Sequence, residues 1–187
     1  MRRAWAFFAF VLAAAAPFSQ ARALGRDEWQ AAARLGIGVV HVDGRSPWGE
    51  AAGLDLEYGV ADAWAVRLSA EGSLHGVDKS TKPPLPGGTV TTEALLAGIC
   101  YTIDVLRLVP YADLEFGVAR IGGAVQAPQA MFVSELGLGS DYYLNPRWRV
   151  GVSFQYMYRP QDLLSNPQGL GNAPFTFSAT ARLGFGF

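Results

Sequence analysis

Three side chains on one short segment have the types that nucleophilic catalysis uses. Glu71, Ser73 and His75 are spaced two apart, so on an extended strand all three lie on one face. A histidine beside a serine can accept the hydroxyl proton, and a carboxylate can orient the histidine. However, side chains two apart on a strand lie about 7 Å apart at their backbones, which strains a linear triad. We therefore assign no catalytic residue and interpret the three as rim residues.

A second set of candidate residues carries charge. Acidic and basic side chains recur at alternate positions, on the face opposite the large apolar side chains. The acidic members are Asp55, Glu57, Glu71, Glu93, Asp113, Glu115, Glu135 and Asp141. The basic members are Arg34, Arg67, Arg149 and Arg182.

Charges on a buried face must be paired and hydrogen-bonded, because an isolated buried charge is too costly. Counting outward from the predicted turns, Arg67 faces Asp55 or Glu57, and Arg149 faces Asp141. The set therefore predicts a polar network that packs an interior and fixes the register of the strands. The excess of carboxylates leaves open an alternative, an acidic path for protons or cations.

Metal, cofactor and nucleic-acid binding find little support. The two histidines are far apart, and Cys100 is the only cysteine, so no metal cluster or internal disulfide is expected. Cys100 is expected to pack as a small apolar group. The formal charge is −1, and the only lysines are Lys79 and Lys82. No basic cluster suits nucleic acid, and we expect no cofactor.

The elements that position these residues are strands, because large apolar and small or polar residues alternate along most of the chain. In the segment 175–187, Phe175, Phe177, Leu183, Phe185 and Phe187 lie on one face, with small residues between them. The predicted strands are 34–42, 54–60, 64–71, 90–101, 113–118, 135–142, 148–158 and 175–187. The segment 90–101 is the weakest, because Leu95 and Leu96 place apolar residues on both faces and suggest a bulge or a face switch.

The connections between these strands alternate in length. Short turns are expected near 61–63, 103–107 and 144–146, and longer loops at 43–50, 73–88, 121–130 and 159–173. This alternation predicts an all-β fold, an eight-stranded antiparallel up-and-down barrel. An even number of strands places both ends of the barrel on the side of the short turns.

The aromatic residues decide between a transmembrane barrel and a soluble barrel around a ligand. They gather at strand ends, as the interfacial girdles of a transmembrane β-barrel require. The predicted girdle consists of Tyr58, Trp64, Tyr142, Trp148, Tyr156, Tyr158 and Phe175. The opposite face is rich in Gly, Ser, Ala and Thr and would cover a water-exposed surface poorly. We therefore predict that the apolar face points outward, to lipid.

The N-terminus has the pattern of a signal peptide. Arg2 and Arg3 precede an apolar stretch at 5–16. The sequence Ala-Arg-Ala at 21–23 then has the small-x-small pattern of a signal-peptidase cleavage site after Ala23. The predicted organisation is a signal peptide at 1–23 and a barrel at 24–187.

The last residues, Ala-Arg-Leu-Gly-Phe-Gly-Phe, close an alternating strand and resemble the C-terminal signal of bacterial outer-membrane barrels. Leu183, Phe185 and Phe187 are the residues that carry this likeness. The chain from residue 24 onward resembles small eight-stranded barrels of the OmpA, OmpX and OmpW type. The resemblance implies a bacterial outer membrane, contact with its lipid, and the barrel-assembly machinery as a partner during biogenesis.

These observations predict a structural or surface-interaction role, such as adhesion, exerted through extracellular loops on a rigid scaffold. The ligand is unknown, the lumen is closed by polar side chains, and a monomer is expected. The alternative is a narrow channel for small or apolar solutes. A lipid A-modifying enzyme is the least favoured, because it rests on analogy with other barrels of this size.

Overall fold

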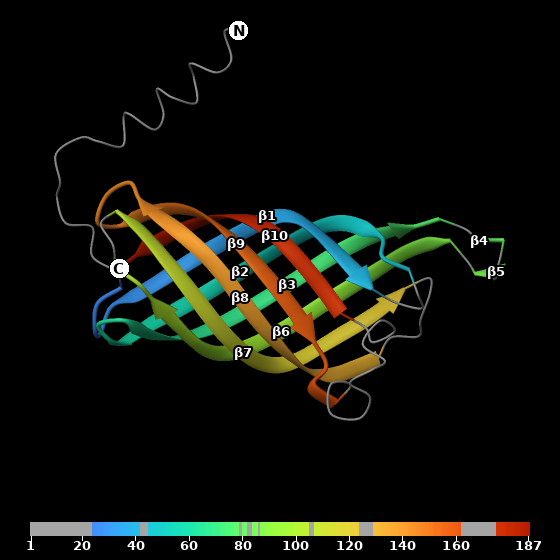
Figure 1. Cartoon of the computed structure of the whole chain (residues 1–187), viewed down its shortest axis with the longest axis horizontal. Helices are drawn as coiled ribbons and strands as arrows, with labels where there is room; N and C mark the ends of the chain where they lie inside the picture. The colour runs from blue at the N-terminus through green and yellow to red at the C-terminus, as the bar shows by residue number, and fades with distance from the viewer. Residues whose placement is uncertain are drawn as a thin grey trace, which may run out of the picture.

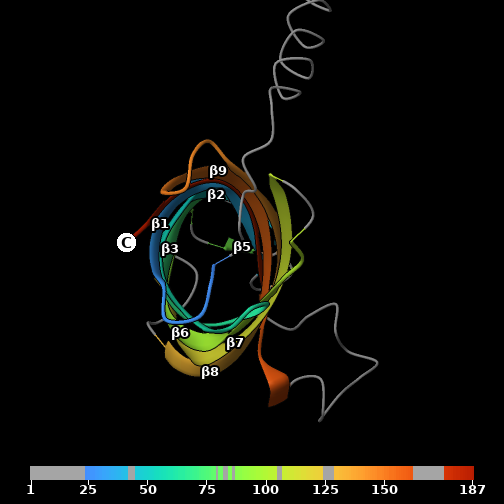
Figure 2. The ribbon, with the colours of Figure 1, turned by 90° about the vertical axis from the view of Figure 1, so that its left-hand side faces the viewer.

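Eight strands close into a single barrel in which every neighbouring pair is antiparallel. The computed structural model describes residues 24–41, 45–78, 80–81, 84–85, 87–104, 107–123, 129–161 and 175–187. The barrel strands are β1 (Trp29–His41), β2 (Trp48–Ala61), β3 (Trp64–Val77), β6 (Gly88–Thr102), β7 (Leu108–Gly123), β8 (Gln129–Tyr143), β9 (Trp148–Tyr158) and β10 (Phe175–Gly186). Each strand pairs with the next one along the chain, and β10 closes onto β1 (Figure 2). The predicted fold is confirmed.

The first barrel strand begins and the last one ends at the same mouth of the barrel, which we call the short-turn end (Figure 1). There Trp29 and Phe187 exchange backbone hydrogen bonds of 2.9 and 3.2 Å. The turns predicted near 61–63, 103–107 and 144–146 all lie at this end. Strands β1, β3, β7 and β9 end at the opposite mouth, which we call the long-loop end.

Several strands run further than the sequence predicts. β1 begins at Trp29 rather than Arg34, and residues 121–123 and 129–130 of the predicted loop 121–130 belong to strands β7 and β8. The largest correction is the predicted loop 73–88. There β3 and β6 stay paired to Val77 and Gly88, and two short strands continue the hairpin, β4 (Ser80–Thr81) and β5 (Pro84–Leu85). Figure 1 shows β4 and β5 projecting beyond the long-loop end. Loop-forming Pro and Gly residues therefore mark only the tip of this hairpin.

The register of β6 is unbroken, which corrects the suspected bulge at 90–101. Leu96 points into the barrel and is 1% exposed, whereas Leu95 points outward and is 54% exposed. Glu93 lies on the outer face with Leu95, so its predicted place in the interior network is wrong. Both faces of β6 carry apolar residues because the interior itself has an apolar layer.

The two faces of the wall are reversed relative to a water-soluble protein. Large apolar side chains cover the outside, such as Leu35, which is 69% exposed, and Leu138, which is 62% exposed. Buried arginines and carboxylates fill the inside. A continuous apolar surface of this kind matches the hydrocarbon of a bilayer. Within the described ranges, no helix is long and apolar enough to cross a membrane.

A short segment ahead of β1 folds into the short-turn mouth. Leu24 is buried there against Ala65, Cys100 and Tyr111. The backbone of 27–28 pairs with Gly59, through Asp27 N to Gly59 O at 2.9 Å and Gly59 N to Glu28 O at 3.0 Å. A Cβ atom on Gly59 would lie 2.0 Å from the Gly25 carbonyl oxygen. Glycine at 59 therefore makes room for the segment that lines this mouth.

We expect Gly59→Ala to lower the free energy of unfolding by about 1–3 kcal/mol, because the new methyl group forces the 24–28 segment away. Urea titration of the refolded barrel measures this change. Gly76→Ala is the matched control, since a Cβ atom there meets nothing within 4 Å. Equal midpoints for the two variants would contradict the packing of this segment.

Candidate functional site

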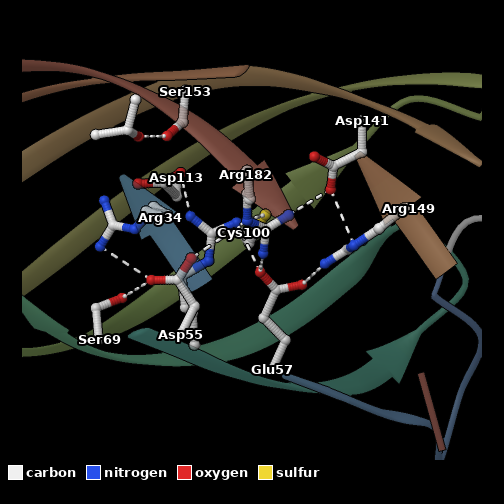
Figure 3. A network of polar contacts seen from close by, with 12 residues as sticks. Arg34, Asp55, Glu57, Ser69, Cys100, Asp113, Asp141, Arg149, Ser153 and Arg182 are labelled. Atoms are coloured by element: carbon white, nitrogen blue, oxygen red, sulfur yellow. Dashed lines mark hydrogen bonds and ion pairs between the residues drawn. The ribbon is translucent and has the colours of Figure 1, made fainter. Parts of the chain in front are cut away.

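A network of buried ion pairs crosses the interior of the barrel, with Arg182 of β10 at its centre (Figure 3). Its guanidinium contacts three carboxylates, with Nε 3.2 Å from Asp55 Oδ2 and the two Nη atoms on Glu57 and Asp141. The Arg182 side chain is 1% exposed. One arginine therefore links strands β2, β8 and β10 across the lumen.

Two further arginines bind the same carboxylates. Arg67 Nη2 lies 2.9 Å from Glu57, and Arg67 Nη1 lies 2.5 Å from Asp113. Arg149 Nη2 lies 2.7 Å from Glu57, and Arg149 Nε lies 3.0 Å from Asp141. Glu57 is thus shared by three arginines, which compensates its burial with several charge-assisted hydrogen bonds. Arg67 faces Glu57, as counting from the short turns predicts. The predicted contact of Arg149 with Asp141 forms diagonally, because the register places Tyr143 opposite Arg149.

The fourth arginine lies on the side of the network nearer the long loops. Arg34 Nη2 is 2.9 Å from Asp55 and 3.5 Å from Glu71. Tyr111 packs beneath the central arginines, with its ring 4.9 Å from the Arg67 guanidinium carbon and 5.3 Å from that of Arg182. These contacts complete a charged layer that spans the barrel.

Three carboxylates next to this layer have fewer positive partners. Asp113 and Glu115 come from β7 and Glu135 comes from β8, where the register pairs Glu115 with Glu135. One oxygen of each can be chosen so that all three lie within 4.8 Å of one another. The sequence could not show this grouping, because the connection between β7 and β8 did not fix their register.

An apolar layer, which the sequence analysis missed, covers the charged layer toward the long-loop end. Its buried members are Leu96, Ala119, Val133 and Met157. A second cluster continues it, made of Val40, Val77, Val90 and Ile121. The inward apolar positions of β6 are the signal that could have revealed this layer. Ion pairs therefore occupy the lumen at one level and apolar side chains at the next.

The structure brings Ser73 and His75 together, but not as a triad with Glu71. His75 Nε2 lies 2.7 Å from Ser73 Oγ, so the spacing of two does not prevent this contact. His75 Nδ1 lies 3.2 Å from the Pro47 carbonyl oxygen, which can only accept. Glu71 instead faces Arg34. Ser73 lines a cavity of about 20 Å³, large enough for little more than one water molecule, and also borders a wider depression of about 690 Å³.

Cys100 lies inside the barrel rather than against lipid. Arg67 Nη2 lies 3.1 Å from its sulfur atom, so the thiol contacts the charged layer as well as the apolar residues Leu24 and Ala65. The expectation of purely apolar packing is therefore incomplete.

The predicted girdle residues lie near the strand ends, and several pack at a tilt against aromatic partners that the prediction left out. At the short-turn end the ring pairs are Trp29–Tyr58, Trp64–Tyr101 and Trp148–Phe185, at 4.8, 4.8 and 4.9 Å. At the other end Tyr156 packs against Tyr158 and Phe175, at 5.9 and 5.5 Å. Tyr142 is half-buried beside the short turn at 144–147. An interfacial role for these rings stays a prediction.

The residues of the predicted assembly signal lie at the end of β10. Leu183 and Phe187 are exposed on the outer face, and Phe185 stacks on Phe187 at 6.4 Å. Phe187 also closes the barrel through its backbone contacts with Trp29. Their recognition by assembly machinery remains a prediction.

We expect Arg182→Ala to lower the free energy of unfolding by about 3–5 kcal/mol, because three buried carboxylates lose a shared partner. Urea titration of the refolded protein measures the loss. Arg147→Ala removes an exposed arginine at a turn and serves as the control, with an expected change within about 0.5 kcal/mol. Similar losses for both variants would show that the network does not stabilise the barrel.

Comparison with known proteins agrees with this geometry. Neisserial surface protein A shares 15% identity with a TM-score of 0.60, over 86% of this chain and 96% of that one. The attachment invasion locus protein Ail of Yersinia pestis shares 17% identity with a TM-score of 0.57, over 87% and 99%. The outer membrane protein OprG of Pseudomonas aeruginosa shares 18% identity with a TM-score of 0.57, over 88% and 98%.

These likenesses show the fold alone. No curated protein matches the sequence. The sequence does match the outer membrane protein beta-barrel domain family over residues 6–182, nearly its whole length. The chain therefore belongs to this family of bacterial outer-membrane barrels.

Proposed function

We propose that this protein is a surface-interaction barrel, which holds binding loops on a rigid scaffold at the outside of the cell. In this proposal the short-turn end faces the periplasm and the long-loop end faces outward. Residues 1–23 lie outside the described residues, and their removal as a signal peptide is part of the proposal. So are a monomeric state and assembly through the C-terminal residues.

The observation that carries this proposal is the blocked interior. Eight strands leave a lumen that side chains can fill, whereas open aqueous pores need about 16 strands. Here ion pairs around Glu57 and Arg182, and then the apolar layer around Leu96, occupy successive levels. A blocked lumen leaves the long-loop end as the surface on which a partner can act.

The β3–β6 hairpin is the element best suited to contact a partner. It projects beyond the other strands (Figure 1). Just after the end of β3, the Asp78 carbonyl oxygen accepts a hydrogen bond of 3.1 Å from Arg45 Nη1. The only lysines of the sequence, Lys79 and Lys82, belong to the segment that joins its two long strands. Two lysines in this connecting segment support a partner that carries negative charge.

One solved structure suggests a probe for such a partner. Ail, which has the same fold, was crystallised in complex with the heparin analogue sucrose octasulfate. We therefore use heparin to test binding.

The alternative, a narrow channel, has one observation in its favour. A cavity of about 480 Å³ opens at the short-turn mouth and is lined by Leu24, Tyr143 and Arg149, among others. Arg149 belongs to the charged layer, so this cavity ends at the ion pairs. We propose no enzymatic activity, because Glu71 faces Arg34 and so leaves Ser73 and His75 without the carboxylate of a triad.

The test is adherence of cells that display the barrel to immobilised heparin and to cultured epithelial cells. We expect adherence above that of cells with an empty vector, and a several-fold loss when residues 78–87 are replaced by a Gly-Ser segment of equal length. A matched replacement of residues 124–128 should keep adherence. Surface levels and heat-modifiable mobility are compared for all forms.

Adherence of the intact barrel no greater than that of the empty vector would contradict the proposal. Equal adherence after replacement of 78–87 would contradict the role of the hairpin.

A further inference from the structure

The carboxylates inside the barrel outnumber the arginines. Among the described residues, seven carboxylates and four arginines point inward. The arginines make their closest contacts with Asp55, Glu57, Asp113 and Asp141. The excess negative charge therefore lies at Glu71, Glu115 and Glu135, beside the apolar layer.

Glu135 is the least compensated of these groups. It is 1% exposed, and neither of its carboxylate oxygens accepts a hydrogen bond from an N–H or O–H donor of the described residues, while the Glu71 carboxyl lies within hydrogen-bonding reach. Its register partners are Glu115 on β7 and Met157 on β9, so one neighbour repels it and the other is apolar. A buried carboxylate in this position needs a positive partner.

The neighbouring carboxylates each keep one oxygen available. Asp113 Oδ2 binds Arg67, and Asp113 Oδ1 has no hydrogen-bond partner. Glu115 Oε1 accepts a 3.1 Å hydrogen bond from Ser69, and Glu115 Oε2 has no partner. Gly137 makes room for the Asp113 carboxylate, because a Cβ atom there would lie 2.1 Å from Oδ1. One oxygen of each residue is anchored, which holds the other oxygen in place for a ligand.

We propose that Asp113, Glu115 and Glu135 bind one calcium ion inside the barrel. The donors are all carboxylate oxygens, the ligands of hard cations. Three of them lie within 4.8 Å of one another, and two oxygens on opposite sides of Ca²⁺ are about 4.8 Å apart, compared with about 4.2 Å around Mg²⁺. The ion joins β7 to β8 and neutralises the excess charge.

The site is closed on both sides. The apolar layer of Leu96, Val133 and Met157 covers it toward the long loops, and Arg67 lies on the other side. The ion is therefore taken up as the barrel folds and is retained afterwards. A single proton shared between Glu71 and Glu135 is the competing arrangement, because two carboxylates can hydrogen-bond only when one is protonated.

Elemental analysis tests the proposal. The full barrel is refolded in detergent with Ca²⁺ and passed through a desalting column into calcium-free buffer. We expect close to one calcium per chain for the wild type and loss of that calcium for Glu135→Gln. Glu93→Gln is the matched control: it removes the same charge from the outer face and should keep the calcium.

Urea midpoints with and without Ca²⁺ give a second readout. Ca²⁺ should raise the midpoint of the wild type and leave that of Glu135→Gln unchanged. Without Ca²⁺, Glu135→Gln should be at least as stable as the wild type, because the amide removes repulsion in the cluster. If this variant does not refold, the calcium content and midpoints of the wild type decide the question.

A wild type that retains no calcium would overturn the proposal, as would equal calcium content in wild type and Glu135→Gln. A urea midpoint that depends on pH and not on Ca²⁺ would show that Glu71 and Glu135 share a proton instead of binding calcium. That result would also overturn the proposal.

Discussion

Glu57 forms ion pairs with Arg67, Arg149 and Arg182, which reach it from strands β3, β9 and β10. These charges lie away from water, so each depends on the others for its compensation. Arg182 and Glu57 are 125 residues apart in the chain, and only closure of the barrel brings them together. The interior network therefore couples side-chain pairing to the closure of the sheet, and one cannot form fully without the other.

Closure of the barrel also pairs the backbone groups that an open sheet would expose to lipid. A transmembrane sheet cannot leave backbone groups unpaired in lipid, and the pairing of β10 with β1 removes the two edges. Once the backbone is satisfied, the outside can be covered by side chains such as Leu35 and Leu138, while polar side chains fill the inside. The same alternation that makes the strands compatible with lipid thus places the charges where they must pair.

The sequence predicted those parts of the site that short turns keep in register. Glu57 and Arg67 are opposite each other across the turn at 61–63, so counting outward from that turn pairs them. Across the turn at 144–147 the same counting brings Arg149 and Asp141 to diagonal positions, close enough for their 3.0 Å ion pair. Glu115 and Glu135 meet across a connection whose length did not fix the register. Glu93 was placed inside because Leu95 and Leu96 gave no clear face for β6. The apolar layer was missed for the same reason, since inward apolar residues look like outward ones in an alternating pattern.

A scaffold filled at two levels can hold loops rigidly without providing a path for solutes. Conductance of the refolded, unmodified barrel in a planar bilayer tests it most directly. The ion pairs around Arg182 and the layer around Leu96 predict no steady conductance above that of the bare bilayer. A steady, large conductance from the unmodified barrel would contradict the claim and favour the channel.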